Sequence, residues 1–310
     1  MTTVRFWSSQ PSSLKPQAGR FWSDVWRRMT PYGDGRWGSL ETVHPDADAD
    51  WTVVLNFLLP DWLDTDHVLD LDRSRAILIQ NEPSCIRHLN KTWGEYAEPE
   101  DIGYAATWTI KEHHFPLDWY LNATYSALYV TNPNFERCRV ISAVQTEKRD
   151  HPGQRLRYEF VKNHLSLMQG FDLFGRSGAS CDSGCYTDNL PCYLGPMPMR
   201  AKDAAMFPYK YHFCAENSSE RNYFSEKIGD AFLAYCLPFY WGCPNLEDFF
   251  PADSFIRVPI ARPGEAMQII AKAIQDDEWV KRLPAIAEAR RLVMDKYQVW
   301  PVIEKMIREL

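Results

Sequence analysis

The chain has 310 residues, of which 45% are hydrophobic and 24% charged, so it is long enough for two ordinary domains and too apolar for a disordered protein. Its net charge of −7 argues against a general nucleic-acid binder, although one or two local cations suffice to bind an anionic nucleotide. The N-terminal segment has neither an apolar run long enough to span a membrane nor the pattern of a signal peptide.

The first part of the chain alternates apolar segments with polar, proline-containing loops. Buried strands are expected where short apolar runs are bounded by turn residues, at Val4–Trp7, Trp51–Leu59, Ala76–Gln80 and Tyr104–Ile110. A helix is expected over Phe21–Met29. This alternation of strands and helices predicts a mainly parallel sheet.

A second unit of the same kind begins near Arg137. Its expected elements are strands at Val140–Val144 and Phe171–Phe174, a helix at Arg155–Gln169, and a helical stretch at Gly264–Leu310 interrupted by Pro284 and Pro301. The sequence therefore predicts a second α/β unit after the first.

The segment Tyr209–Val258 reads as strand, polar loop, helix, strand, loop and strand. Within its helix, Tyr223, Glu226, Lys227 and Asp230 are spaced to share one polar face. The opposite face is expected to be apolar, with members that include Phe224, Ile228, Ala231, Phe232 and Tyr235. A helix that opens after a strand and a loop offers free N–H groups to an anion, and Lys227 adds a positive charge nearby. The segment therefore predicts a nucleotide site.

The cysteines and the early acidic residues do not form a convincing metal site. Cys181, Cys185 and Cys192 have the spacing C-x3-C-x6-C with no fourth partner nearby, whereas zinc sites usually contain paired C-x2-C units. Buried thiols are expected for a second group, Cys214, Cys236 and Cys243. A third group, Asp46, Asp48 and Asp50, imitates a metal-binding DxD motif but precedes a strand far from the nucleotide segment, which favours a solvated turn.

Several linked motifs in the nucleotide segment resemble the glycosyltransferase family 10 fucosyltransferases. They are AENS at Ala215–Ser218, the pattern Tyr223-x-x-Glu226-Lys227, LPFYWGCPN at Leu237–Asn245 and FFPADSFI at Phe249–Ile256. Their order and separations are similar to those of the family, and linked motifs are far more specific than one short motif. The resemblance extends back to Val140 and is weak before Gly103.

The resemblance implies a GT-B fold, in which two Rossmann-like domains face a cleft. Residues 1–137 would form an acceptor-side domain, residues 138–296 a domain that binds GDP-fucose, and residues 297–310 a helix packed back on the first domain. The implied activity is inverting transfer of L-fucose from GDP-β-L-fucose to a saccharide hydroxyl, in an α1,3 or α1,4 linkage.

The resemblance places the general base at Glu82, in the sequence QNEPS that follows the strand Ala76–Gln80. Ligands of α/β sheets bind at strand ends, which fits this position. The alternative is a glutamate in a surface turn, and a slip of one residue would bring Asn81, which cannot act as a base, to the family position.

The resemblance assigns the donor diphosphate to Arg157 and Lys227, with Arg155 as a competing choice. Arginine suits this task because its guanidinium can bind phosphate oxygens in a bidentate manner. The alternative for Arg157 is a solvated charge on a helix.

Further donor contacts are implied for Glu226, Glu216, Asn217, Tyr223 and Arg176. Glu226 would accept hydrogen bonds from hydroxyls of the ribose or fucose, and is counted with Glu82 among the catalytic residues. Glu216 and Asn217 could meet the ribose or guanine, or Glu216 could hold the loop. Tyr223 could pack beside the base or sugar, or belong to the core.

The expected partners are GDP-fucose and a glycan acceptor, with no nucleic acid, no membrane span, no tightly bound cofactor and no metal needed for the chemistry. A cytoplasmic enzyme of bacterial or viral type is expected, in solution or at the membrane periphery. Two alternatives remain open: a GT-B transferase that uses another nucleotide sugar, and a non-catalytic protein that binds nucleotide sugars.

Overall fold

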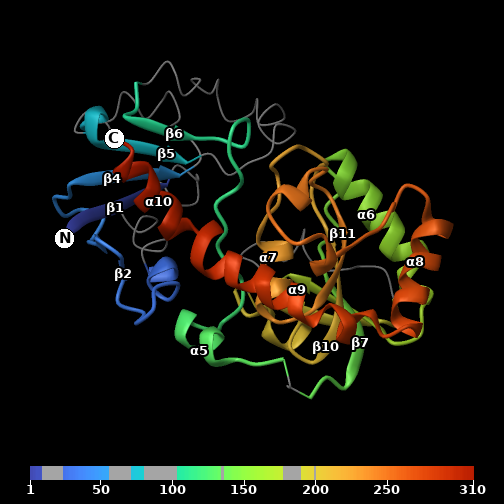
Figure 1. The fold of residues 1–310 in the computed structure, drawn as a ribbon. Coiled ribbons are helices and arrows are strands. Elements are labelled where there is room, and N and C mark those ends of the chain that lie inside the picture. The colour runs from blue at the N-terminus through green and yellow to red at the C-terminus, as the bar shows by residue number, and fades with distance from the viewer. Residues whose placement is uncertain (9–23, 56–70, 80–102, 134–135, 177–189, 199) are drawn as a thin grey trace. The chain divides into compact units, whose positions relative to one another are not determined.

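The computed structural model describes residues 1–8, 24–55, 71–79, 103–133, 136–176, 190–198 and 200–310. Glu82, Cys181 and Cys185 lie outside these ranges. The chain divides into two compact units (Figure 1). Unit 1 comprises Met1–Pro116, Thr124–Tyr129 and Tyr297–Leu310, and unit 2 comprises Leu117–Ala123 and Val130–Lys296. Their roles as acceptor-side and donor-side domains stay predictions.

Unit 1 is built on a six-stranded sheet with the order β2-β3-β1-β4-β5-β6. Its strands are β1 (Thr2–Ser8), β2 (Arg36–Trp37), β3 (Leu40–Thr42), β4 (Trp51–Leu55), β5 (Ala76–Ile79) and β6 (Ala106–Trp108). Neighbouring strands are parallel except β2 and β3. The strands β4 and β5 are almost entirely buried, as their apolar sequences require.

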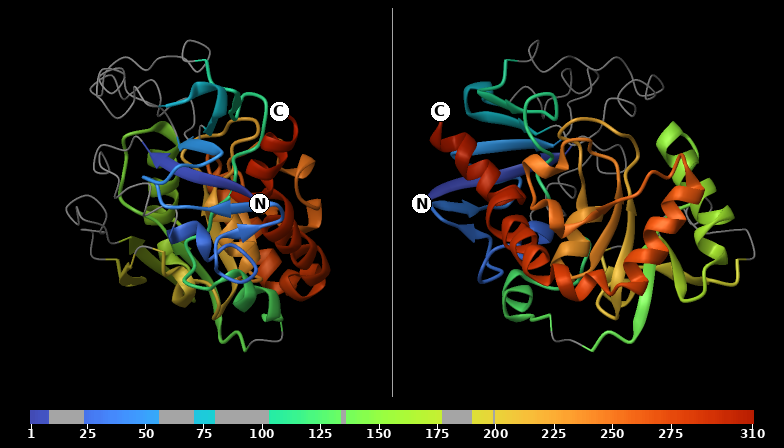
Figure 2. Two further views of the ribbon diagram at one scale, coloured as in Figure 1. Left: turned by 90° about the vertical axis from the view of Figure 1, so that its left-hand side faces the viewer. Right: turned by 45° about the vertical axis from the view of Figure 1, so that its right-hand side comes forward.

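The C-terminal helix α10 (Val299–Arg308) belongs to unit 1 and packs beside its sheet (Figure 2). The Nε1 of Trp300 donates a hydrogen bond of 2.8 Å to the carbonyl of Trp26. The Trp300 ring also meets Phe6 of β1 edge to face, with centroids 5.7 Å apart. These contacts tie the last helix to residues from the start of the chain. The short helix α5 (Tyr125–Val130) has all but its last residue in this unit.

Unit 2 contains a second six-stranded sheet, in which all pairs are parallel and the order is β12-β11-β10-β7-β8-β9. Its strands are β7 (Arg139–Val144), β8 (Phe171–Arg176), β9 (Tyr193–Met197), β10 (Tyr209–Ala215), β11 (Leu237–Trp241) and β12 (Ile256–Arg257). Counted from β7, this is the strand order of a Rossmann fold. The order reverses between β7 and β10, and ligands of such sheets bind at the carboxyl ends of the strands at that point.

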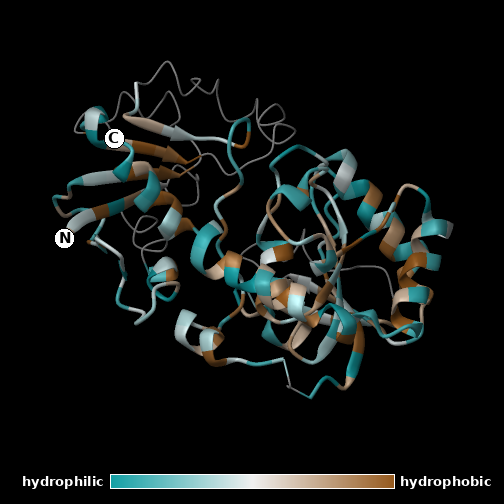
Figure 3. Ribbon diagram, in the orientation of Figure 1, coloured by the Kyte–Doolittle hydropathy of each residue, from teal (hydrophilic) through white to brown (hydrophobic). Residues whose placement is uncertain are grey.

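Helices cover both faces of the unit 2 sheet (Figures 1 and 2). They are α6 (Pro152–Asn163), α7 (Glu226–Leu233), α8 (Pro263–Gln275) and α9 (Glu278–Leu292). Along β10, Tyr211, Phe213 and Ala215 point into the core shared with α6 and α8, because alternate strand residues face the same side. On α8, Ala266 and Ile270 are buried one turn apart, and Figure 3 shows hydrophobic residues on this helix alternating with hydrophilic ones.

The predicted α/β class with parallel sheets is confirmed, and each predicted strand of known placement is present. The two predicted interruptions of the C-terminal helical stretch are wrong. Pro284 does not interrupt a helix but lies inside α9; the breaks come instead at Asp277, with a φ of 45°, and at a π-helical turn over Val293–Tyr297. Pro301 lies in the first turn of α10, where proline is tolerated.

The helix of the nucleotide segment also begins later than predicted. It starts at Glu226, so Tyr223 and Phe224 precede it and do not share its faces. Asn222 has a φ of 65°, a left-handed backbone conformation that an α-helix cannot contain, so the helix begins after it. At the other end Tyr235 adopts a φ of 57°, which places it beyond the helix.

The structure also bears on membrane spans and on the cysteines. Among the described residues, no helix is long and apolar enough to cross a membrane. Cys214, Cys236 and Cys243 are buried, as predicted, and burial raises the pKa of the Cys214 thiol well above its usual value.

Candidate functional site

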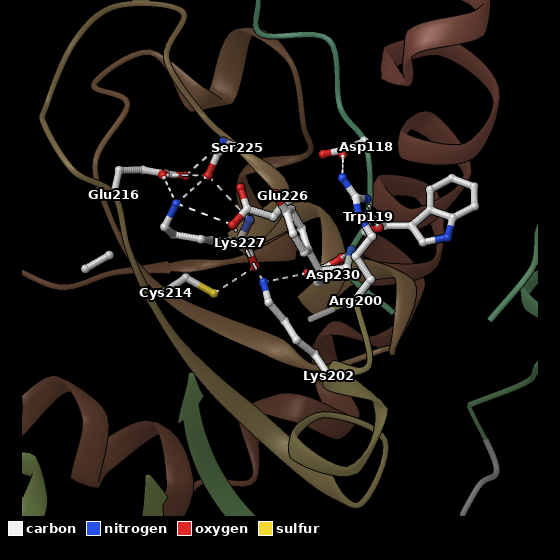
Figure 4. Close-up of polar contacts among 12 residues, drawn as sticks. Asp118, Trp119, Arg200, Lys202, Cys214, Glu216, Ser225, Glu226, Lys227 and Asp230 are labelled. Atoms are coloured by element: carbon white, nitrogen blue, oxygen red, sulfur yellow. Dashed lines mark hydrogen bonds and ion pairs between the residues drawn. The ribbon is translucent and has the colours of Figure 1, made fainter. Parts of the chain in front are cut away.

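The N-terminus of α7 is held by a buried carboxylate at the end of β10. Glu216 is completely buried, and its Oε1 accepts a hydrogen bond of 2.9 Å from the Ser225 backbone N–H. Its Oε2 accepts one of 2.7 Å from the Ser225 hydroxyl (Figure 4). Ser225 is the N-cap of α7. Glu216 therefore fixes where the helix begins, which agrees with the alternative that it holds the loop.

Lys227 and Glu226 occupy the first turn of α7. The Lys227 ammonium lies 3.3 Å from Glu216 Oε2 and 3.6 Å from Glu226 Oε1, and donates to the Ser225 hydroxyl at 2.9 Å. The Glu226 side chain is 15% exposed and that of Lys227 is 21% exposed. Both predicted donor residues thus have fixed positions at the N-terminus of a helix that follows the end of β10.

A second lysine, Lys202, lies outside the nucleotide segment and also reaches the Glu226 carboxylate. Lys202 Nζ lies 2.8 Å from Asp230 Oδ2 and 3.7 Å from Glu226 Oε1. Asp230 is completely buried and accepts a 2.8 Å hydrogen bond from the Tyr120 N–H. Burial raises the pKa of Asp230 to about 6, against the opposing effect of Lys202. The predicted polar face of α7 is therefore partly an interior face.

A small cavity opens at the carboxyl ends of β7 and β10, the point where the strand order reverses. Its lining residues are Val144, Gln145, Arg157, Lys202, His212, Phe213, Cys214, Ala215 and Lys227. The three cations among them make an environment suited to phosphate oxygens. Arg157 is buried and donates to the Ala215 carbonyl at 3.0 Å, whereas Arg155 is exposed and does not line the cavity.

His212 contributes an uncharged acceptor to this cavity. The Ser142 hydroxyl has one hydrogen and lies within hydrogen-bonding distance of the Ala205 carbonyl, which can only accept. His212 Nδ1, 2.7 Å from the same hydroxyl oxygen, must then donate, which leaves the lone pair on Nε2. Burial, aided by Lys202, lowers the pKa of His212 to about 3, so the ring is neutral at physiological pH.

Lys202 and His212 are the lining residues that sequence reasoning missed. Lys202 comes from a 3-10 turn before β10, in a stretch without a motif. His212 sits in an apolar strand, where a polar residue facing away from the main core was a weak signal. Only the pairing of β10 with β7 brings His212 beside Ser142.

The loop that carries Asn217 lies tightly against the start of α6. A Cβ atom on Gly153 would lie 2.2 Å from the Asn217 carbonyl oxygen, closer than any side chain allows. Glycine at position 153 therefore lets the loop that carries Asn217 approach the N-terminus of α6.

We expect Gly153→Ala to lower the free energy of unfolding by about 1–3 kcal/mol, because the loop must move to admit the methyl group. Gly264→Ala is a matched control, since it also follows a proline at the start of a helix but meets nothing within 4 Å. The control should be neutral or slightly stabilising, and urea unfolding of both variants measures the difference. Equal effects would contradict the close approach.

The other predicted site residues have the following positions. Tyr223 is 3% exposed, as its core alternative requires, and Arg176 ends β8. Asp50 accepts hydrogen bonds from the N–H and hydroxyl of Thr3, which lower its pKa. Within the described ranges, no group of three or more histidine, cysteine or acidic residues is arranged to hold a metal ion.

Comparisons with known proteins bear on the same segment. Residues 133–278 match the family model of the glycosyltransferase family 10 (fucosyltransferase) C-terminal region. An alpha-(1,3)-fucosyltransferase of Helicobacter pylori is 35% identical over 60 residues, which are 19% of this chain and 13% of that protein. A fucosyltransferase-like protein of Arabidopsis thaliana is 33% identical over 75 residues, which are 24% of this chain and 14% of that protein. The matches thus span a small part of each relative's length.

The fold has solved counterparts. A crystal structure of a glycosyltransferase from Rickettsia africae superposes with a TM-score of 0.55 over 99% of this chain and 97% of that one, at 9% identity. At this identity the likeness concerns the fold alone.

Proposed function

We propose that the protein is an inverting fucosyltransferase that uses GDP-β-L-fucose, because residues 133–278 match the family model of the glycosyltransferase family 10 (fucosyltransferase) C-terminal region. The observation that carries the proposal is the cavity at the switch point of the unit 2 sheet, whose lining includes Arg157 and Lys227. These two cations suit the negative charge of a nucleoside diphosphate, and the position is where Rossmann-like sheets bind nucleotides.

In this proposal the diphosphate lies against Arg157 and Lys227. Departure of GDP from the fucose C1 places growing negative charge on the β-phosphate, and preorganised cations stabilise that charge. Arg157 is held by the Ala215 carbonyl and Lys227 by Ser225, so neither side chain needs to reorganise during the reaction. Because Arg157 and Lys227 stabilise the charge of the departing GDP, the proposal needs no metal ion. We therefore expect turnover to persist when a metal chelator is added.

In the proposal, residues at and near the N-terminus of α7 contact the sugar and the nucleoside of the donor. Glu226 accepts hydrogen bonds from vicinal hydroxyls of the donor, and Asn217 and Arg176 contact the nucleotide side. Glu216 acts through the loop rather than on the ligand, because it is completely buried and both its oxygens accept from Ser225. Tyr223 belongs to the core in this proposal, since it is buried.

The acceptor hydroxyl attacks C1 of fucose as the bond from C1 to the phosphate oxygen breaks, which inverts the configuration. Glu82 takes the proton of that hydroxyl. The acceptor is a saccharide, and the new linkage is α1,3 or α1,4.

Calorimetric titration with GDP-fucose, GDP-mannose and UDP-galactose tests the donor, and a transfer assay with a saccharide panel tests the reaction. Preference for GDP-fucose together with release of GDP supports the proposal. Tight binding without turnover on any acceptor would favour a binding protein, and preference for another donor would reassign the substrate.

We expect Lys227→Ala to weaken GDP binding by about 10- to 100-fold, because a charge-assisted contact to phosphate is lost. Lys281→Ala is the control, since this exposed lysine of α9 pairs with Glu278 and does not line the cavity. Titration with GDP measures both variants. Unchanged affinity of the Lys227 variant would remove this residue from the diphosphate site.

A further inference from the structure

Lys202 is anchored by three kinds of contact. Its backbone N–H donates to the Tyr120 carbonyl at 3.0 Å, and its ammonium lies 4.9 Å from the centre of the Tyr120 ring. Its side chain is 9% exposed and forms a 2.8 Å ion pair with Asp230. A long, flexible side chain is thereby held in one conformation.

The same ammonium reaches Glu226, one turn before Asp230 on α7 (Figure 4). Glu226 Oε1 lies 3.7 Å from Lys202 and 3.6 Å from Lys227. One carboxylate oxygen is therefore placed between two ammonium groups that come from different parts of unit 2. This arrangement restricts rotation of the carboxylate more than a single ion pair does.

Stability alone does not account for these buried charges. Taking an ion pair out of water costs about as much free energy as the attraction returns, and apolar replacements are often as stable. Lys202, the cation of this pair, also lines the cavity. Its position favours a role at the ligand.

We propose that Lys202 is a positioning residue, which fixes the Glu226 carboxylate in the orientation that accepts hydroxyls of the donor sugar. The proposal rests on the fucosyltransferase function proposed above. Lys202 acts through Glu226, so its removal should affect recognition of the sugar more than recognition of the nucleotide.

The test uses the double variant Lys202→Met/Asp230→Asn. Removing both charges avoids an unpaired buried ion, and the asparagine oxygen still accepts from the Tyr120 N–H. We expect the affinity for GDP-fucose to fall about 10-fold and the affinity for GDP to change less than about 3-fold. Lys272→Met/Asp276→Asn removes an exposed 2.7 Å pair that does not line the cavity, and should change neither affinity.

A double-mutant cycle that adds Glu226→Gln tests whether the loss of affinity for GDP-fucose acts through Glu226. If Lys202 acts through Glu226, this change costs much less affinity for GDP-fucose in the double variant than in the wild type. Full additivity, or equal losses for GDP and GDP-fucose, would overturn the positioning role.

The outcomes separate the two proposals. Wild-type protein that neither prefers GDP-fucose to GDP-mannose and UDP-galactose nor transfers fucose overturns the fucosyltransferase function, and the positioning role with it. Wild-type preference that survives in the double variant overturns the role of Lys202 alone. A folded double variant, verified by its circular dichroism spectrum, is the condition for either comparison.

Discussion

Glu82→Ala is expected to lower kcat for fucose transfer by about 10²- to 10⁴-fold, which is the usual contribution of a general base. The acceptor hydroxyl would keep its proton as the bond to C1 forms, so the transition state would lose its proton acceptor. Binding of GDP should persist, because the proposed phosphate contacts come from unit 2 whereas residue 82 does not. Rate measurements at saturating donor and titration with GDP check the two halves of this expectation.

Glu82→Gln and Asn81→Ala complete the experiment. Glutamine keeps the shape of the side chain but cannot accept a proton at neutral pH, so it should be as inactive as alanine. The asparagine variant should retain most of the rate. Loss of activity in Asn81→Ala with retention in Glu82→Ala would show that the assignment is displaced by one residue.

Asp230→Ala should lower the free energy of unfolding by about 3–5 kcal/mol, because it leaves the buried Lys202 ammonium without its nearest carboxylate. It also removes the acceptor of the Tyr120 N–H. The matched control is Glu288→Ala, which breaks the exposed pair with Arg291 and should cost less than about 1 kcal/mol. Urea unfolding measures both, and similar small effects would show that Lys202 does not depend on Asp230.

Asp230 also predicts a pH dependence of stability. Its pKa in the folded protein is about 6, above the ordinary value of 3.8, because burial disfavours the charged form. The folded state therefore holds this proton more tightly than the unfolded state. Its stabilising contribution is complete below pH 3.8 and is lost as the pH rises through about 6. Asp230→Asn should remove this part of the pH profile of the free energy of unfolding, and an unchanged profile would assign it to another group.

The sequence by itself determined the α/β class and the similarity of the nucleotide segment to the family 10 fucosyltransferases. Strands such as Ala76–Ile79 were readable because an apolar run bounded by turn residues is a local signal. The motif Tyr223-x-x-Glu226-Lys227 was readable for the same reason, since its residues are neighbours along the chain. The sequence did not predict that α7 begins only at Glu226. The helical spacing of residues extends back to Tyr223, but the backbone of Asn222 has a positive φ and is not helical.

Only the tertiary structure decided which charged groups meet. Lys202 is separated from Asp230 by 28 positions, and Tyr120 from Asp230 by 110, so no local pattern links them. The pairing of β7 with β10 sets the place of the cavity, which the buried Arg157 lines and the exposed Arg155 does not. Residue spacing gives the faces of a helix, but burial depends on what packs against each face, and that depends on contacts between distant segments.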